Sequence, residues 1–217
     1  MVCSQLAQAD ELDWVGTTEA PAWNTESENW AETGTTTPTV TFTEGDDVTF
    51  TAAPEADVST TVSVEEDVAA GRVTVDGDYT FEAEGDAVIT GDIQGAGSIT
   101  KTGAGTLTLE ATADNADSAL ALTVEEGGLM LDGTNAYGTA DIAEDAVLTV
   151  PETGDITFND AVNGSTLVAE GAATLMADSA ITTLDAPGTL TVGADGVEPT
   201  LTITEAATIG TLNNFGT

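Results

Sequence analysis

Three tryptophans lie near the start of the chain, at Trp14, Trp23 and Trp30. Flat aromatic rings can stack on the apolar faces of sugars, so these side chains could form a platform that binds a glycan. They could instead form a cap, because the first coil of a repeat protein exposes an apolar interior and unpaired strand edges. Their place directly before the first strand pattern favours the cap, and the platform remains the alternative.

Acidic residues form short clusters that could hold Ca²⁺, which prefers carboxylate oxygens. The clusters are Asp46-Asp47, Glu65-Glu66-Asp67, Asp76 with Asp78, Glu125-Glu126 and Glu144-Asp145. However, the sequence has neither an EF-hand loop nor the glycine-rich nonapeptide of calcium-binding β-rolls. We therefore expect solvated turns with weak, non-specific Ca²⁺ uptake, and no defined metal or cofactor site.

The residue types also argue against catalysis. The chain has no histidine and a single cysteine, Cys3, which disfavours zinc sites, Ser-His-Asp triads and an activated thiolate. Glycoside hydrolysis needs a carboxylate pair at a fixed separation, and among 39 Asp and Glu no pair stands out. We expect that the protein is not an enzyme and has no catalytic residues.

The charge balance limits the partners. Lys and Arg number 2 against 39 Asp and Glu, which gives a formal net charge of −37. Nucleic-acid binding requires basic side chains that neutralise phosphates, and an anionic membrane surface would repel this chain. The charge therefore argues against both partners and leaves an extracellular glycan or a host surface open.

Short strands dominate the chain from residue 38 onward, where apolar residues alternate with Thr or Ser. This period of two is typical of strands with one buried face. Gly, Asp, Asn or Pro fills the gaps, as tight turns require. No helix is predicted, and no stretch is apolar enough to cross a membrane as a helix. We expect nine side chains of the alternating pairs to face inward: Val73, Val75, Leu107, Leu109, Val124, Leu129, Leu131, Leu148 and Val150.

Two architectures fit many short strands, a β-sandwich and a β-solenoid. The strand motif is nearly uniform from Val40 to Leu212, and aromatic residues make up only 5% of the chain. Both features favour the solenoid, whose stacked coils bring small and branched side chains into ladders. We predict an all-β, parallel β-helix over residues 38–217, with about four to nine coils.

The two N-terminal segments have a different composition. Residues 10–37 hold all three tryptophans and form the predicted N-terminal cap segment. In residues 1–9, Ala7-Gln8-Ala9 has the small-x-small pattern of a signal-peptidase site, although a long apolar region is missing. This segment is either a signal-peptide remnant or a disordered tail.

Residues 95–131 carry a regularly spaced motif. Its positions are Gly95, Gly97, Lys101, Gly103, Gly105, Leu107, Leu109, Gly127, Leu129 and Leu131. This spacing resembles the passenger-associated transport repeat of bacterial autotransporters, and Lys101 stands at the lysine position of that repeat. The arrangement of Trp14, Trp23-Asn24 and Asn29-Trp30 is similar to the N-terminal part of many such passengers.

The resemblance implies a single-stranded right-handed β-helix that is exported through the periplasm of a Gram-negative bacterium and is secreted or held at the cell surface. In that family the repeat is associated with folding and transport of the passenger domain. The C-terminal translocator barrel of the outer membrane has no counterpart in this sequence. The chain would then be a passenger piece with its translocator barrel encoded downstream, a truncated gene product or a barrel-less relative.

The motif residues also predict a local structure. Gly103 and Gly105 flank the short link between Ile99 and Leu107, which suits a sharp corner between two faces of a coil. We predict that Lys101 points outward at this corner, among acidic neighbours. The motif is thus expected to build a corner without a binding role.

Three functional hypotheses follow from these observations. The first is a non-enzymatic exported surface protein, in which an autotransporter-type passenger segment serves as a stalk or structural rod. The second is an adhesin that binds host or matrix glycans through the Trp region or a solenoid face. The third and least favoured is a polysaccharide hydrolase.

Overall fold

The computed structural model describes residues 9–17, 19, 21–52, 58–116, 118–194 and 197–215. The described residues form an all-β structure of eighteen strands without a helix. No helix that could cross a membrane is therefore found in them. Most of the predicted signal-peptide remnant, including Cys3, lies outside the described residues.

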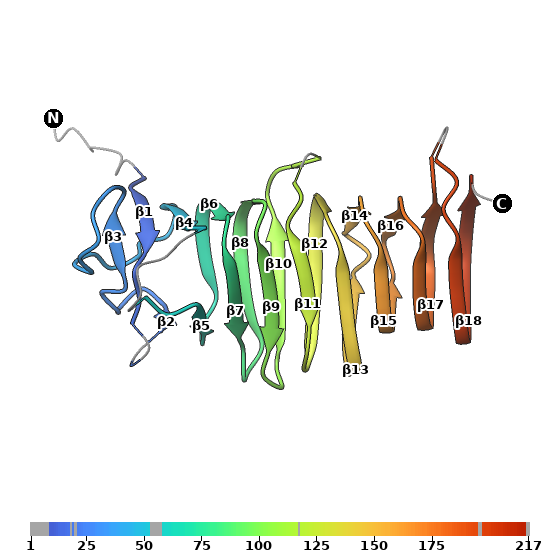
Figure 1. Cartoon of the computed structure of the whole chain (residues 1–217), viewed down its shortest axis with the longest axis horizontal. Helices are drawn as coiled ribbons and strands as arrows, with labels where there is room; N and C mark the ends of the chain where they lie inside the picture. The colour runs from blue at the N-terminus through green and yellow to red at the C-terminus, as the bar shows by residue number, and fades with distance from the viewer. Residues whose placement is uncertain are drawn as a thin grey trace, which may run out of the picture.

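The strands follow one another in a single continuous sheet that winds along the chain (Figure 1). Their bounds are β1 Glu11–Trp14, β2 Ala22–Trp23, β3 Trp30–Glu32, β4 Asp47–Phe50, β5 Thr61–Val64, β6 Val68–Val75, β7 Asp78–Glu82, β8 Ala87–Gln94, β9 Ser98–Thr102, β10 Thr106–Ala111, β11 Ala121–Val124, β12 Gly128–Tyr137, β13 Ala140–Val150, β14 Asp155–Phe158, β15 Val162–Ala169, β16 Ala172–Leu175, β17 Ser179–Val192 and β18 Leu201–Asn214.

Parallel pairing between successive coils makes the structure a β-solenoid. Thr61 of β5 pairs with Thr80 of β7, and Thr80 pairs with Thr100 of β9, so these coils take 19 and 20 residues. The solenoid has about 7 turns, which at about 4.8 Å per coil gives a stack of about 34 Å. The predicted parallel β-helix is therefore confirmed, with a coil number inside the predicted range.

Each later coil has three sides. Strand β18 pairs with β17 along three segments, residues 201–203, 206–209 and 211–214, with register shifts between them. The shifts mark the corners, where the chain changes direction between flat faces. Figure 1 shows the same strands as a stack of arrows running across the long axis of the molecule.

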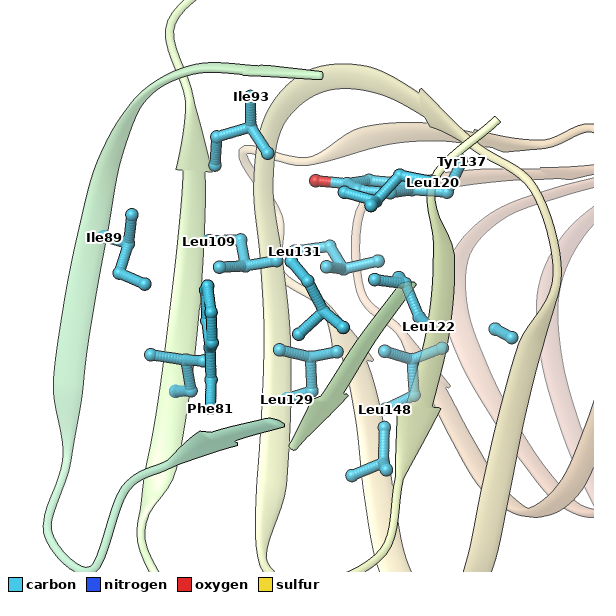
Figure 2. Close-up of a cluster of buried hydrophobic side chains, with 14 of the residues drawn as sticks. Phe81, Ile89, Ile93, Leu109, Leu120, Leu122, Leu129, Leu131, Tyr137 and Leu148 are labelled. Atoms are coloured by element: carbon cyan, nitrogen blue, oxygen red, sulfur yellow. The ribbon is translucent and has the colours of Figure 1, made fainter. Parts of the chain in front are cut away.

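The interior of the coils is apolar because every second residue of a strand points inward. Strand β8 shows the alternation, with Ala87, Ile89, Gly91 and Ile93 buried. All nine side chains predicted to face inward are at most 1% exposed. Figure 2 shows some of them, including Leu109, Leu129, Leu131 and Leu148, gathered inside the coils with Leu122.

Deleting side-chain volume from this interior should be costly, and Leu109→Ala gives a direct test. Leu109 is 1% exposed and lies in register between Ile89 and Leu131. We expect the free energy of unfolding, measured by urea titration, to fall by about 2–5 kcal/mol. The control is Thr108→Ala on the outer side of the same strand, which should cost far less. Equal losses for the two variants would contradict the assigned register.

Tyr137 is a residue of this core that carries a polar group. The side chain is fully buried in β12, in register with Phe158 of β14. Its hydroxyl makes no hydrogen bond of normal geometry with the described residues. Burial raises the pKa of Tyr137 to about 12, while the nearby Asn135 side chain opposes part of the shift. The hydroxyl therefore stays protonated well above the usual range of a tyrosine.

Tyr137→Phe should change the alkaline stability of the protein more than its stability at pH 8. At pH 8 the hydroxyl has no partner to lose, so the free energy of unfolding should stay the same or rise slightly. Above pH 10 the unfolded chain loses the Tyr137 proton first, and stability falls as pH rises towards 12. This contribution, about 2–3 kcal/mol at pH 12, should be missing in the variant. Urea titrations at pH 8, 10 and 11.5 would measure it, and parallel alkaline declines of both proteins would contradict the burial argument.

Candidate functional site

The three tryptophans lie inside the N-terminal end of the solenoid. Trp14, Trp23 and Trp30 are 1%, 0% and 0% exposed. The ring centroids of Trp14 and Trp30 are 5.1 Å apart, those of Trp23 and Trp30 are 5.5 Å apart, and Phe50 of the first coils contacts all three rings. Edge-to-face packing of this kind is favourable for aromatic rings. The predicted N-terminal cap is therefore confirmed.

Burial of the rings removes the surfaces that a glycan platform needs. A sugar stacks on an open ring face, and no tryptophan offers one in this structure. Trp14 Nε1 is also engaged, because it donates to the backbone oxygen of Ser59 at 2.8 Å. The hypothesis that Trp14, Trp23 and Trp30 form a stacking platform is therefore corrected, since the first coil needs the same apolar surfaces to close its end.

The glycines of the 95–131 motif lie where the backbones of neighbouring coils approach most closely. A Cβ atom on Gly97 would lie 2.1 Å from the backbone oxygen of Gly77, and one on Gly105 would lie 2.1 Å from that of Gly85. Gly95, Gly103 and Gly127 show similar close approaches and have positive φ angles. Only glycine fits such positions without moving the next coil. The predicted sharp corner at Gly103 and Gly105 agrees with this geometry.

The prediction that Lys101 points outward is wrong. Its side chain is 0% exposed. Its Nζ donates to the backbone oxygens of Thr102 and Gly103 at 2.7 Å each, and more weakly to those of Glu126 at 3.3 Å and Ala83 at 3.5 Å. Ala83 follows β7, Gly103 follows β9 and Glu126 follows β11, which are neighbours in one ladder. The ammonium group thus binds the same corner in three successive coils.

The period of two in β9 explains the inward direction. Ile99 is buried, Thr100 is partly exposed, and Lys101 is again buried. Its register partners Phe81 and Val124 are core residues. The alternation of β9 predicts that the Lys101 side chain points inward. Its positive charge favoured the opposite prediction, a position at the surface. The long aliphatic stem resolves this conflict, because it lies in the core while the ammonium reaches the carbonyl oxygens of the corner.

Burial lowers the pKa of Lys101, while the negative charges of Glu126 and Glu84 oppose the shift. These two carboxylates follow β11 and β7, on either side of the Lys101 corner. The Lys101 ammonium therefore has negative charges nearby, although it donates its hydrogen bonds to backbone carbonyl oxygens. The hydrogen bonds of the ammonium in the described structure are those of a structural clamp.

The acidic clusters do not come together into a metal centre. In the described part of the chain, no group of three or more Asp, Glu, Cys or His side chains could hold a metal ion. Asp46 is buried because its carboxylate accepts backbone hydrogen bonds from Asp10 and Thr43. Asp47 and Asp92 instead flank Arg72, at 3.8 Å and 3.3 Å. These carboxylates have structural partners within their own turns and ladders.

An uncharged strip on one face of the solenoid was not anticipated from the sequence. Two outward ladders run side by side across successive coils and contain no Asp, Glu, Lys or Arg. All their residues are partly exposed. We call the following residues the uncharged strip: Thr106, Gly128, Val147, Thr166 and Thr183 in one ladder, and Val88, Thr108, Met130, Thr149 and Val168 in the other.

The strip can offer methyl groups and hydroxyls on a flat surface. Five coils at about 4.8 Å make each ladder about 19 Å long. Acidic residues border it, since Asp185 continues one ladder and Glu110 and Asp132 stand at the next position along their strands. A hollow of about 390 Å³ lies at its first coils, and it is lined by Asp67 and Asp86 as well as by Val88, Thr108 and Met130. Only the coil offsets, which no single stretch of sequence reveals, bring these residues together.

A larger groove lies beside the loop that joins β10 to β11. It measures about 740 Å³ and is lined by polar residues that include Asp76, Gln94, Asp114 and Asn115. The Asn115 amide is occupied, because it donates to Asp92 at 2.6 Å and to the backbone oxygen of Ile93 at 3.0 Å. The groove carries the carboxylates of Asp76 and Asp114, so it suits a neutral surface less well than the later coils of the uncharged strip.

Comparison of the chain with known protein families, with curated proteins and with solved structures gave no match.

The clamp role of Lys101 predicts that Lys101→Met lowers the free energy of unfolding by about 1–3 kcal/mol, because the corner carbonyls lose their donor. Arg72→Met is the matched control, since it removes the other positive charge from an exposed site and should cost about 1 kcal/mol or less. Thermal and urea unfolding would compare the two variants at one ionic strength. A Lys101→Met variant as stable as the parent would mean that burial of the ammonium costs as much as its hydrogen bonds contribute.

Proposed function

We propose that this protein is an exported, non-enzymatic surface protein, an autotransporter-type passenger segment that serves as a stalk or structural rod. The observation that carries the proposal is the unbroken parallel ladder from β4 to β18, which joins every coil to the next. The motif over residues 95–131 supports the family assignment, because its spacing resembles the passenger repeat and its glycines and Lys101 build a corner of the rod.

A rod of this kind needs stiffness and solubility. Stiffness comes from the ladders, in which each coil is hydrogen-bonded to its neighbours along the long axis. Solubility comes from the net charge of −37, which makes the sides of separate rods repel one another. The Trp cap covers the apolar interior at the first coils, as terminal coils of repeat proteins require.

Surface display can be tested on cells that produce the protein. Antibodies raised against the purified chain should label intact cells, and external protease should remove the label. A periplasmic or cytoplasmic protein probed in parallel should be labelled only after permeabilisation. Labelling that appears only in permeabilised cells would contradict the proposed location.

The uncharged strip favours a second candidate function, an adhesin for a neutral glycan. A molecule with a charge of −37 repels polyanions. The later coils of the strip are a part of its sides where a neutral, methyl-rich surface can approach without desolvating a carboxylate. Thr hydroxyls at Thr108 and Thr149 could hydrogen-bond sugar hydroxyls, and Met130 between them offers an apolar surface. The solenoid face thus replaces the Trp region as the proposed glycan contact.

A glycan array probed with the purified chain separates the two candidates. If the strip binds neutral glycans, Thr149→Asp should weaken binding by at least about tenfold, because a buried carboxylate costs more than 1.4 kcal/mol. Thr123→Asp places the same charge on an outward ladder of another face and should leave binding unchanged. An array without neutral-glycan binding, or equal loss in both variants, would contradict the adhesin function and leave the rod.

A further inference from the structure

A hollow of about 390 Å³ lies where the uncharged strip begins, over the first residues of β8, β10 and β12. Figure 1 shows these three strands side by side. The lining combines the carboxylates of Asp67 and Asp86 with the apolar side chains of Val88 and Met130. A lining of this kind suits a ligand that carries one cationic group on a carbon skeleton.

The two carboxylates stand at the start of the two ladders of the strip. Asp67 lies one coil before Val88, and Asp86 lies one coil before Thr106. Because Asp86 comes two residues before Val88 in the chain, the carboxylates are diagonal neighbours, with Cα atoms about 8 Å apart. Both side chains can therefore reach a single group that sits between them.

One oxygen of each carboxylate is already used in the structure. Oδ1 of Asp67 accepts a hydrogen bond from the backbone N–H of Val88 at 2.9 Å, and Oδ1 of Asp86 accepts one from that of Thr106 at 2.9 Å. Within the described ranges of the chain, no hydrogen bond or ion pair engages the other oxygen, Oδ2. The backbone thus fixes the direction of both side chains, and each keeps one oxygen for a ligand.

The two basic residues of the chain do not neutralise this negative charge. Lys101 is buried and donates its hydrogen bonds to backbone carbonyl oxygens. Arg72 forms its ion pairs with two carboxylates that do not line the hollow. Asp67 and Asp86 are exposed to solvent. A cation that neutralises them must therefore come from another molecule or from the solvent.

The donors and acceptors suit an ammonium group better than a metal ion. Ca²⁺ takes about six to eight oxygen ligands, and no group of three or more acidic side chains in the described structure could hold a metal ion. An ammonium group has only three donor hydrogens. Oδ2 of Asp67, Oδ2 of Asp86 and the hydroxyl of Thr108 supply three acceptors around the hollow. Val88 and Met130 then offer apolar contacts to the carbon atoms beside the ammonium.

We propose that this hollow binds the protonated amino group of an amino sugar. A sugar fits better than a simple polyamine, because the strip continues from the hollow with the hydroxyls of Thr149 and Thr166. A sugar whose ammonium lies in the hollow can place its own hydroxyls along these ladders. The site goes beyond the neutral-glycan candidate, because it selects for a positive charge, and it shares only the face of the solenoid with that candidate.

Isothermal titration calorimetry of the full chain tests the ligand class. The probes are a glucosamine tetramer with free amines and the N-acetylated tetramer of the same linkage. At pH 6 the free-amine tetramer should bind at one molecule per chain, at least about fivefold more tightly than the acetylated one. Its binding should be lost at pH 9, because such amines titrate near α-amino groups, at about pH 8. Spermidine that binds as tightly as the free-amine tetramer would overturn the assignment to a sugar.

Charge-neutral variants test the position of the site. Asp67→Asn and Asp86→Asn keep a side-chain oxygen for the backbone N–H, and each should weaken binding of the free-amine tetramer by about fivefold, the upper range for an exposed ion pair. Asp178→Asn is the matched control, because Oδ1 of Asp178 accepts from the N–H of Thr200 at 2.7 Å in the same way but outside the hollow. This control should leave binding unchanged. Equal losses in all three variants would indicate general attraction to an acidic protein and would overturn the site.

The two tetramers also separate this site from the neutral-glycan candidate. Binding of the free-amine tetramer that depends on Asp67, without binding of any neutral glycan, would support the hollow and contradict the neutral-glycan adhesin. Equal binding of both tetramers that Asp67→Asn does not change would overturn the hollow and leave the strip as the glycan contact. Failure of one proposal is therefore distinct from failure of the other.

Discussion

The parallel backbone ladder between successive coils is the interaction on which the rest of the structure depends. Because the ladder keeps coils in register, each residue type repeats above its counterpart, as Ile89, Leu109 and Leu131 do in the core. The same register forces the backbones together at the corners, where a Cβ on Gly97 or Gly105 would collide with the coil beneath. Core packing and glycine placement are therefore two consequences of one hydrogen-bond pattern.

Two large side chains with polar groups, Lys101 and Tyr137, are fully buried in this core, and they differ in their hydrogen bonds. Lys101 satisfies carbonyl oxygens at three stacked corners, and its charge is balanced at a distance by Glu84 and Glu126. Tyr137 has no such partner, and its raised pKa shows the cost of ionising a group in an apolar interior. Lys101 thus ties neighbouring coils together, whereas Tyr137 mainly contributes the volume of its ring.

The distribution of charge separates the surfaces of the solenoid. Acidic side chains dominate the charge of the chain, which keeps molecules apart, whereas the residues of the uncharged strip carry no charge. At the N-terminal coils, aromatic packing of the tryptophans covers the core. Electrostatics and aromatic packing therefore give the sides and the N-terminal coils of the described solenoid different surfaces.

The sequence by itself determined the fold class and the inward face of the strands. Alternating pairs such as Val73 with Val75 can bury only one side of a strand. The position of the tryptophans before the first coil favoured a cap over its apolar interior. Tertiary structure decided what the Lys101 ammonium binds, because its acceptors include carbonyls of neighbouring coils that the sequence does not place. It also decided the uncharged strip, since the coil length varies and the register between Thr108, Met130 and Thr149 exists only after stacking. The period of two within a strand determines whether a side chain points inward or outward. Its contacts depend on the register between coils, which exists only in the folded solenoid.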